Sequence, residues 1–438
     1  MTATIAAVAT PPGRGGVGII RLSGPDAVPI SLGLCRRESV WRPRHAHCTR
    51  FLDHDGEVID EGLLLYFPAP FSYTGEDVIE CQIHGSPVLL ESLLRRLFGL
   101  GAVAAEPGAF TRRAVENGKM DLSQAEAVVA CIDAATERAA RQAQRHLQGE
   151  FGRLIEGLMH ELTDAVAHIE ACLDFPEEEI PDLLSAQVRR TVQTRLLEPI
   201  EGLLARASFG ERLFDGARIA IIGAPNVGKS SLMNVLSGRD RAIVSDTAGT
   251  TRDVLELDFE VHGIPVRLLD TAGLRVSGDA IEQEGVRRAR HAAGEADVVV
   301  FVADATRPDT WVCDELAQLR VLNKVDLCDS GSIPDGFLPV SARQGQGVAV
   351  FVDRLAALLG EIQAGEEGLF VTRHRHEQCL RMTRDQLEKG IVMLDDHDRW
   401  ELVALEWRRA WSALGEIVGV GDVEFILDRV FSQFCIGK

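Results

Sequence analysis

Several features that define other protein classes are missing from this 438-residue sequence. No apolar stretch approaches the roughly 20 residues that span a bilayer, so we expect no membrane segment. The nine cysteines form no Cys-x-x-Cys pair and no zinc-ligand spacing, which favours reduced thiols in a cytoplasmic protein. The N-terminus shows neither the basic nor the long apolar region of a signal peptide. Basic residues are not in excess, since 46 Lys and Arg face 66 Asp and Glu, and the net charge of −20 excludes a generally basic nucleic-acid coat protein.

The apolar pattern changes three times along the chain and predicts a multidomain protein. Short apolar runs and one strong helix at Pro87–Phe98 predict an α+β domain over 1–118. Residues 119–213 repeat apolar residues every three or four positions, which predicts long amphipathic helices. Residues 214–362 alternate strand-like and helix-like segments, as an α/β nucleotide-binding domain does, and helical periodicity returns over 363–438. The simplest organisation is an α/β domain inserted into a helical domain. The helical repeats include Ala127, Cys131, Ala134 and Ala135, and Leu154, Leu158, Leu162, Val166 and Ile169.

A phosphate-binding loop lies near the middle of the chain. Residues 223–231 read GAPNVGKSS, which fits Gly-x-x-x-x-Gly-Lys-[Ser/Thr] between a strand-like run at 218–222 and a helix-like run at 231–236. The glycines let backbone N–H groups curl round phosphate oxygens, and the helix N-terminus adds partial positive charge. We expect Lys229 to reach the β- and γ-phosphates and the Ser230 hydroxyl to bind Mg²⁺.

Three further motifs follow in the order of a guanine-nucleotide domain. Asp270–Gly273 (DTAG) ends a strand-like run, where the aspartate can hold Mg²⁺ through water and the glycine N–H can bond the γ-phosphate. Asn323–Asp326 (NKVD) ends another, and its aspartate can accept two N–H bonds that guanine offers and adenine does not. Ser341–Arg343 (SAR) fits the last base-contacting loop.

Two further segments offer candidates for a conformational switch and for the hydrolytic step. Residues 245–253 form a polar loop suited to an order–disorder switch, with Thr250 and Thr251 as phosphate or Mg²⁺ contacts, and a plain surface loop is an equal alternative. Leu274 stands where many GTPases carry the glutamine that orients the attacking water. Glu282 is therefore the best candidate for that role and Glu284 the alternative, although acids also suit a solvated helix start.

Four segments resemble the tRNA-modification GTPases of the MnmE (TrmE) family. They are Asn226 within the phosphate loop together with GTTRD at 249–253, ATPPGRGGVGIIR at 9–21, YTGEDVIE at 73–80, and the tail FCIGK at 434–438. The resemblance reaches both ends of the chain. It implies an α+β N-terminal domain that binds 5,10-methylene- or 5-formyl-tetrahydrofolate, and a helical domain with an inserted Ras-like P-loop G domain. It also implies a cytoplasmic homodimer.

The same resemblance implies a reaction and a partner. With the flavoprotein MnmG (GidA), in a heterotetramer or larger complex, such a protein adds an aminomethyl-type group to C5 of the wobble uridine (position 34) of tRNA. GTP hydrolysis would drive a conformational step of this modification, with the G domains pairing when nucleotide is bound.

Residue roles are implied position by position. Potassium would be held by Asn226, Ser245, Thr247 and Thr250, and Mg²⁺ by Ser230 and Thr251. Glu282 would orient water, and Arg21, Glu80, Lys119 and Lys438 would contact the folate. Cys435 matches a tail cysteine proposed to act in the modification, with a plain free thiol as the equal alternative. The expected GTP contacts are Asn226, Val227, Gly228, Lys229, Ser230, Ser231, Ser245, Asp246, Thr247, Ala248, Gly249, Thr250, Thr251, Asp270, Thr271, Ala272, Gly273, Asn323, Lys324, Val325, Asp326, Ser341, Ala342 and Arg343.

One departure and two rival functions stay open. The segment between Asp304 and Asn323 is short, which predicts that the helix before the base-binding strand is reduced. The rivals are a ribosome-assembly GTPase that acts as an RNA-binding switch, and a one-carbon folate enzyme whose G domain is regulatory. The first usually carries a basic RNA-binding module, and none is visible here. Four arginines, Arg373, Arg375, Arg381 and Arg384, could contact tRNA phosphates, but a solvated helix face is the favoured interpretation.

Overall fold

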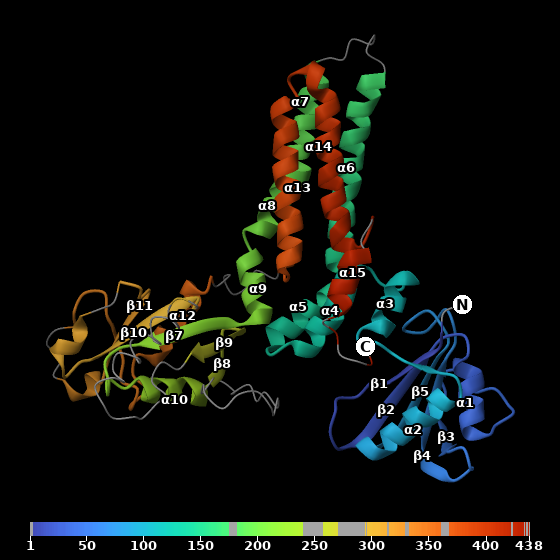
Figure 1. The fold of residues 1–438 in the computed structure, drawn as a ribbon. Coiled ribbons are helices and arrows are strands. Elements are labelled where there is room, and N and C mark those ends of the chain that lie inside the picture. Colours follow the sequence, from blue (N-terminus) through green and yellow to red (C-terminus); the bar gives the residue numbers. More distant parts are fainter. Residues whose placement is uncertain are drawn as a thin grey trace. The chain divides into compact units, whose positions relative to one another are not determined.

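The computed structural model describes residues 3–174, 182–239, 257–269, 294, 296–312, 315–328, 333–360, 368–421, 424–432, 434 and 437. The chain divides into two compact units (Figure 1). The first unit comprises Met1–Val129, His146–Gly157 and Leu414–Lys438, and the second comprises Ala130–Arg145 and Leu158–Ala413.

The first unit is built on a six-stranded sheet in the order β3-β4-β5-β2-β1-β6. Neighbouring strands are antiparallel except for β1 and β6, which run parallel. The register pairs Arg21 on β2 with Glu80 on β5, so both side chains leave the same face of the sheet. The strands are β1 (Ile5–Val8), β2 (Gly15–Ser23), β3 (His47–Leu52), β4 (Val58–Phe67), β5 (Val78–Gly85) and β6 (Val103–Ala104).

Helices close both faces of this sheet. The main core joins α1 (Ala27–Cys35) and α2 (Pro87–Gly99) to alternate residues of the central strands, such as Ile20 and Leu22 of β2. Pro87 begins α2, where its missing N–H is not needed. On the other face, Ile5 and Ala7 pack with Phe110 of α3 (Ala109–Glu116). The α+β class expected for this part of the chain is confirmed.

The C-terminal segment returns to the first unit. Phe431 of α15 (Glu424–Phe431) and Phe434 pack with Ala125 of α4 (Leu122–Asp133). Arg112 donates to the Asp428 carboxylate at 2.7 Å. Gly437 lies so close to β1 that a Cβ there would be 2.1 Å from the Val8 carbonyl oxygen. Gly437 therefore lies beside the segment that opens the 9–21 motif.

Long helices make up much of the second unit. The ribbon shows α6, α7, α13 and α14 running beside one another (Figure 1). The Arg408–Glu170 ion pair joins α14 to α6, and Arg195–Glu161 joins the π-helical turn after α7 to α6. Trp407 of α14 is fully buried against α13. The helices are α5 (Glu137–Leu147), α6 (Glu150–Asp174), α7 (Asp182–Thr191), a π-helical turn (Val192–Leu197), α8 (Glu198–Leu204), α9 (Ala207–Asp215), α13 (His374–Met393), a 3-10 turn (His397–Arg399) and α14 (Trp400–Val418).

The second unit also contains a six-stranded sheet in the order β12-β11-β10-β7-β9-β8. All neighbours are parallel except β8 and β9. The central strands are apolar on both sides, since all seven residues of β10 are buried, as expected of a parallel sheet covered on both faces. The strands are β7 (Ala217–Ile222), β8 (Leu257–Val261), β9 (Ile264–Leu269), β10 (Val298–Asp304), β11 (Leu319–Asn323) and β12 (Leu338–Pro339), with helices α10 (Lys229–Arg239) and α12 (Val348–Leu358).

This α/β part is inserted between helices, as expected. Its chain enters after α9 and leaves before α13, and the two crossings meet where the Phe209 and Phe370 rings lie 5.2 Å apart. Among the described residues between β10 and β11, the only helix is a 3-10 turn, η2 (Pro308–Trp311), which agrees with the reduced segment expected there. Within the part of the chain that the structure describes, no helix is long and apolar enough to span a bilayer.

Candidate nucleotide-binding site

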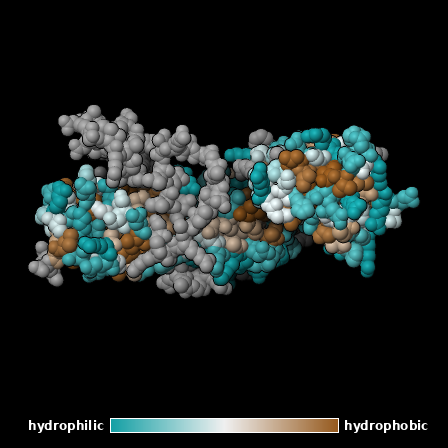
Figure 2. Space-filling model, turned by 90° about the horizontal axis from the view of Figure 1, so that it is seen from below, coloured by the Kyte–Doolittle hydropathy of each residue, from teal (hydrophilic) through white to brown (hydrophobic). Residues whose placement is uncertain are grey.

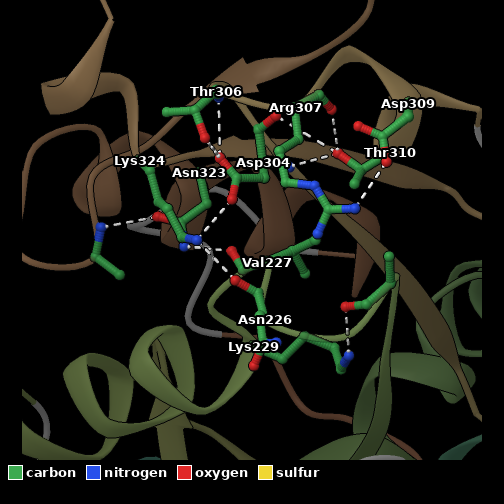
Figure 3. A network of polar contacts seen from close by, with 12 residues as sticks. Asn226, Val227, Lys229, Asp304, Thr306, Arg307, Asp309, Thr310, Asn323 and Lys324 are labelled. Carbon is green, nitrogen blue, oxygen red and sulfur yellow. Dashed lines mark hydrogen bonds and ion pairs between the residues drawn. The ribbon is translucent and has the colours of Figure 1, made fainter.

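The phosphate loop joins the central strand β7 to helix α10. Lys229 is the first residue of α10, and its ammonium donates to the carbonyl oxygens of Gly223 and Ala224 at 2.8 and 3.0 Å. The ammonium therefore lies inside the curve of the loop (Figure 3). Ser230 and Ser231 follow it and are exposed at the helix N-terminus, where an anion is favoured.

Three residues of the loop have positive backbone φ angles, and that of Gly223 is 144°. Asn226 has φ 65° and Gly228 has φ 98°. A Cβ at Gly228 would lie 2.2 Å from the side-chain nitrogen of Asn323, which no real contact allows. Glycine is needed at 228 both for its backbone angle and for the close approach of the segment that carries Asn323.

The segment expected to recognise guanine is hydrogen-bonded directly to this loop. The Asn323 amide donates to the Val227 carbonyl oxygen at 2.9 Å and accepts from the Ala342 N–H at 3.0 Å (Figure 3). Lys324 donates to the Asn226 carbonyl oxygen at 2.7 Å. Three motifs that lie far apart in sequence therefore meet at one edge of the sheet, the edge formed by the carboxyl ends of the parallel strands, where α/β domains bind ligands.

The remaining base-loop residues line the same edge. Asp326 lies half-buried in the 3-10 turn η3 (Val325–Leu327). Ser341 is fully buried, and its hydroxyl accepts the Gln344 N–H at 3.1 Å. Arg343 is exposed. This geometry places an acidic side chain and buried turn residues beside the phosphate loop.

Asp304 belongs to this network although no motif singled it out. It ends β10, and one carboxylate oxygen lies 2.6 Å from the Lys324 ammonium. The other accepts from the backbone N–H and hydroxyl of Thr306 at 2.9 and 2.7 Å. Burial alone would raise the pKa of Asp304, but the bonds from Lys324 and Thr306 outweigh it and lower the pKa below 3.8. The only signal in the sequence is an acid that closes an otherwise apolar strand.

Several predicted site residues lie outside the residues that the structure describes. They are Ser245, Asp246, Thr247, Ala248, Gly249, Thr250 and Thr251 of the switch-like loop, Asp270, Thr271, Ala272 and Gly273, the candidate base Glu282, and Cys435 and Lys438 of the tail.

In the first unit the structure brings two of the expected folate contacts together. Arg21 and Glu80 form a half-buried ion pair at 2.9 Å. The Arg21 guanidinium also lies 5.3 Å from the Tyr73 ring centre and 5.7 Å from that of Phe110. Burial raises the pKa of Tyr73 above 10, although Thr111 and Arg21 oppose the shift. Lys119 donates to the Pro70 carbonyl oxygen at 2.9 Å, so it joins the loop that carries Tyr73. Sequence reasoning missed Phe110, since nothing in the pattern placed α3 at this face.

Two of the four arginines considered for tRNA contact are paired along their own helix. Arg381 donates to Glu377 at 2.9 Å, and Arg384 donates to Asp385 at 2.7 Å. The Arg384–Asp385 pair fits a solvated helix face, whereas Glu377 is buried and holds Arg381 at the edge of the helix packing.

Comparisons with known proteins agree over the whole chain. A sequence model of the GTP-binding protein TrmE N-terminus matches residues 4–119, and one of the MnmE helical domain matches residues 122–435. A protein named tRNA modification GTPase MnmE in Pseudomonas paraeruginosa is 45% identical over 457 residues, covering 100% of this chain and 99% of that protein. One of the same name in Xylella fastidiosa is 47% identical over 445 residues, covering 99% and 98%. A solved G domain of the T. maritima FeoB iron transporter covers 32% of this chain and 98% of its own, at 24% identity and a TM-score of 0.26.

Proposed function

This chain belongs to the MnmE (TrmE) family of tRNA modification GTPases, and on that premise we propose that it hydrolyses GTP in the modification of tRNA. One observation carries the proposal. Asn323 and Lys324, which begin the segment expected to recognise guanine, are bonded to Val227 and Asn226 of the phosphate loop. The segment expected to recognise guanine is hydrogen-bonded to the phosphate loop. We therefore expect the two segments to bind one nucleotide and not two separate ligands.

Guanine is the base that this arrangement favours. Asp326 offers a carboxylate that can accept both the N1–H and the exocyclic amine of guanine. Adenine offers neither donor at that edge, and the half-buried carboxylate would be left unpaired. We therefore assign the guanine contacts to Asn323, Lys324, Val325 and Asp326, with Ser341, Ala342 and Arg343 closing the base pocket.

Magnesium and potassium complete the proposed site. Of the residues assigned to Mg²⁺ (Ser230, Thr251) and to K⁺ (Asn226, Ser245, Thr247, Thr250), the structure describes Ser230 and Asn226, and both are exposed at the phosphate loop. Hydroxyl and amide oxygens suit hard cations, so these two residues fit the assignment. A potassium ion held by these residues would supply the positive charge that an arginine finger gives in other GTPases.

Potassium activation is tested with the purified full-length chain. We expect GTP turnover to rise strongly when K⁺ replaces Na⁺ at equal ionic strength, and Asn226→Ala to abolish that difference. Equal turnover in the two salts would remove potassium from the proposal.

Glu282→Ala is expected to lower turnover while GTP binding stays near normal. Retained turnover would transfer the role of orienting water to Glu284 or another group.

The first unit is proposed to hold the tetrahydrofolate one-carbon donor. A guanidinium held by Glu80 beside the Tyr73 and Phe110 rings suits an aromatic ligand that carries carboxylates. Arg21, Glu80, Lys119 and Lys438 are the assigned contacts, and Gly437 lies near β1 of the same unit. The folate, when bound, supplies the carbon that is transferred, and the role of Cys435 in that transfer belongs to the same proposal. Glu80→Gln should weaken the binding of 5-formyl-tetrahydrofolate, measured by calorimetry.

Assembly with other molecules is part of the proposal. Hydrophobic surface gathers over the N-terminal α+β part, at the right of Figure 2. Hydrophobic surface on this part supports a homodimer that forms through it. The net charge of −20 favours tRNA contact with the help of the flavoprotein partner MnmG. We place this assembly in the cytoplasm, with domains over 1–118, 119–213 plus 363–438, and 214–362.

A further inference from the structure

The Lys324 ammonium has two acceptors that lie on different segments. It donates to the Asn226 carbonyl oxygen of the phosphate loop at 2.7 Å and to the Asp304 carboxylate at 2.6 Å (Figure 3). The Lys324 side chain is 31% exposed, whereas that of Asp304 is 3% exposed. The lysine can therefore reach water, and the buried carboxylate is the fixed end of the pair.

Each polar group of Asp304 has a hydrogen-bond partner. Thr306 donates to its second carboxylate oxygen, the Thr310 hydroxyl accepts its backbone N–H at 3.0 Å, and the Trp311 indole donates to its carbonyl oxygen at 2.8 Å. These partners come from the short segment after β10 that contains η2. The reduced segment that set this sequence apart thus closes over Asp304 and fixes its position.

From this geometry we propose that Asp304 is a positioning residue for guanine-nucleotide binding, one that holds Lys324 and through it the Asn226 peptide of the phosphate loop. The inference rests on the proposed assignment of Asn323–Asp326 to the guanine site. An ammonium placed between a carboxylate and a carbonyl oxygen is fixed in direction as well as in charge. Without the Asp304 carboxylate, the Lys324 ammonium hydrogen-bonds to water in place of Asp304 and the Asn226 carbonyl oxygen. The Asn226 peptide is then no longer held by Lys324.

The first experiment measures nucleotide affinity of the full-length chain. In Asp304→Asn the dissociation constants of fluorescent GDP and GTP should rise about tenfold, the effect of losing one charge-assisted hydrogen bond. The KM for GTP should rise in parallel. Asp309→Asn is the matched control, since Asp309 is an exposed acid of the same segment that pairs with Arg307. Unchanged affinity in Asp304→Asn would overturn the proposal.

A double-mutant cycle separates positioning from a merely structural role. Lys324→Met should weaken nucleotide binding, and adding Asp304→Asn to it should weaken binding no further. If Asp304→Asn still lowers affinity by the same factor in the Lys324→Met background, Asp304 acts only through the fold of its segment and the proposal is wrong. If Lys324→Met itself leaves affinity unchanged, the guanine-site assignment fails instead.

A third experiment measures the melting temperatures of the nucleotide-free proteins. It tests the proposal even if the Asp304→Asn variant does not fold. Lys324→Met leaves a buried carboxylate without its cation, a costly state. The double variant Lys324→Met/Asp304→Asn should therefore melt at a higher temperature than Lys324→Met and bind nucleotide equally. A double variant that melts no higher would show that the two side chains are not coupled, and would overturn the proposal.

Discussion

At the scale of single residues, Asn323 uses both ends of its carboxamide within the protein. Its amide donates to Val227, its oxygen accepts from Ala342, and the side chain is 2% exposed. The residue therefore joins the phosphate loop to the base-contacting loops before any nucleotide is considered. A site whose segments are already bonded to each other loses little conformational freedom when the ligand binds.

Substitution of Gly228 tests how closely the phosphate loop packs against Asn323. Gly228→Ala places a Cβ 2.2 Å from the Asn323 amide at a backbone φ of 98°. We expect GTP affinity to fall by at least about tenfold, since displacing Asn323 and straining the loop together cost more than about 1.4 kcal/mol. Gly336→Ala is the matched control, because Gly336 also has a left-handed φ of 84° in the same sheet domain but has only a side-chain nitrogen, at 3.9 Å. Equal loss of affinity in both variants, measured by fluorescent-nucleotide titration, would contradict this prediction.

The sequence predicted most of this junction and missed one member. Asn323, Lys324 and Lys229 belong to short motifs whose chemistry is explicit in the residue types. Asp304 belongs to no motif, and its burial depends on residues 305–311 folding over it. Phe110 was missed for a similar reason. It lies beside Arg21 only in the folded protein, and the spacing of residues along the sequence does not indicate that contact.

At the scale of elements, the helices of the second unit pack closely enough to require glycine. Gly390 of α13 faces Trp407 of α14, and a Cβ there would lie 2.1 Å from the indole nitrogen. The Trp407 indole also donates to the Leu387 carbonyl oxygen at 3.4 Å. The indole ring is fully buried, so it cannot move away from a methyl group added at Gly390.

Gly390→Ala should therefore destabilise the helical bundle by about 1–3 kcal/mol, the cost of overpacking a rigid core site. Gly202→Ala is the control, since Gly202 is an exposed helical position of α8 with nothing within 4 Å of an added Cβ. That change should stabilise the bundle by about 0.5–1 kcal/mol, because alanine loses less backbone entropy. Calorimetric melting measures both, and a Gly390→Ala transition at or above that of the native chain would refute the packing argument.

The junction of α9 and α13 predicts a pH dependence. Burial raises the pKa of Glu211 above 4.5, the nearby Glu377 charge adds to the shift, and His374 partly opposes it. A raised pKa means that the folded protein holds this proton more tightly than the unfolded chain. Stability from this group is present below pH 4.5 and is lost as the pH rises through the folded pKa.

Glu211→Gln cannot ionise and so should melt at a higher temperature than the native chain at pH 7. The difference should shrink as the pH falls toward 4.5, because Glu211 of the folded native chain then takes up its proton and no longer carries a buried charge. Melting temperatures across pH 4.5–8 check the trend, and a difference that stays constant or grows toward acid pH would contradict it.

Element types were largely predictable, whereas element ends and helix phase were not. The strands around 18–22, 62–67 and 218–222 form as expected. In α6, however, Leu154 is 36% exposed and Ile155 is fully buried, because spacings of three and four fix a stripe only to within a residue. Helix α4 ends at Asp133, so Ala134 and Ala135, expected in the helical repeat, lie beyond it. The π-helical turn at Val192–Leu197 precedes Pro199, whose missing N–H interrupts the regular ladder.

At the scale of the whole molecule, the inserted α/β part is tied to the helices at its crossings. A Cβ at Gly210 would lie 1.9 Å from the Val371 carbonyl oxygen, and Arg145 donates to the Gly368 carbonyl oxygen at 2.9 Å. The Thr136 hydroxyl donates to the Gly263 carbonyl oxygen at 2.8 Å, in the turn between β8 and β9. An inserted domain whose entry and exit are adjacent keeps its own fold while remaining attached.

The central claim is that this chain couples GTP hydrolysis to tRNA modification, and the nucleosides of tRNA test it most directly. tRNA is isolated from a strain that lacks the gene and from the same strain carrying the native chain or Lys229→Ala, and position 34 is analysed by mass spectrometry. We predict that the C5-modified uridine is lost in the deletion strain, returns with the native chain and does not return with Lys229→Ala. Full modification in the deletion strain, or full restoration by Lys229→Ala, would contradict the account.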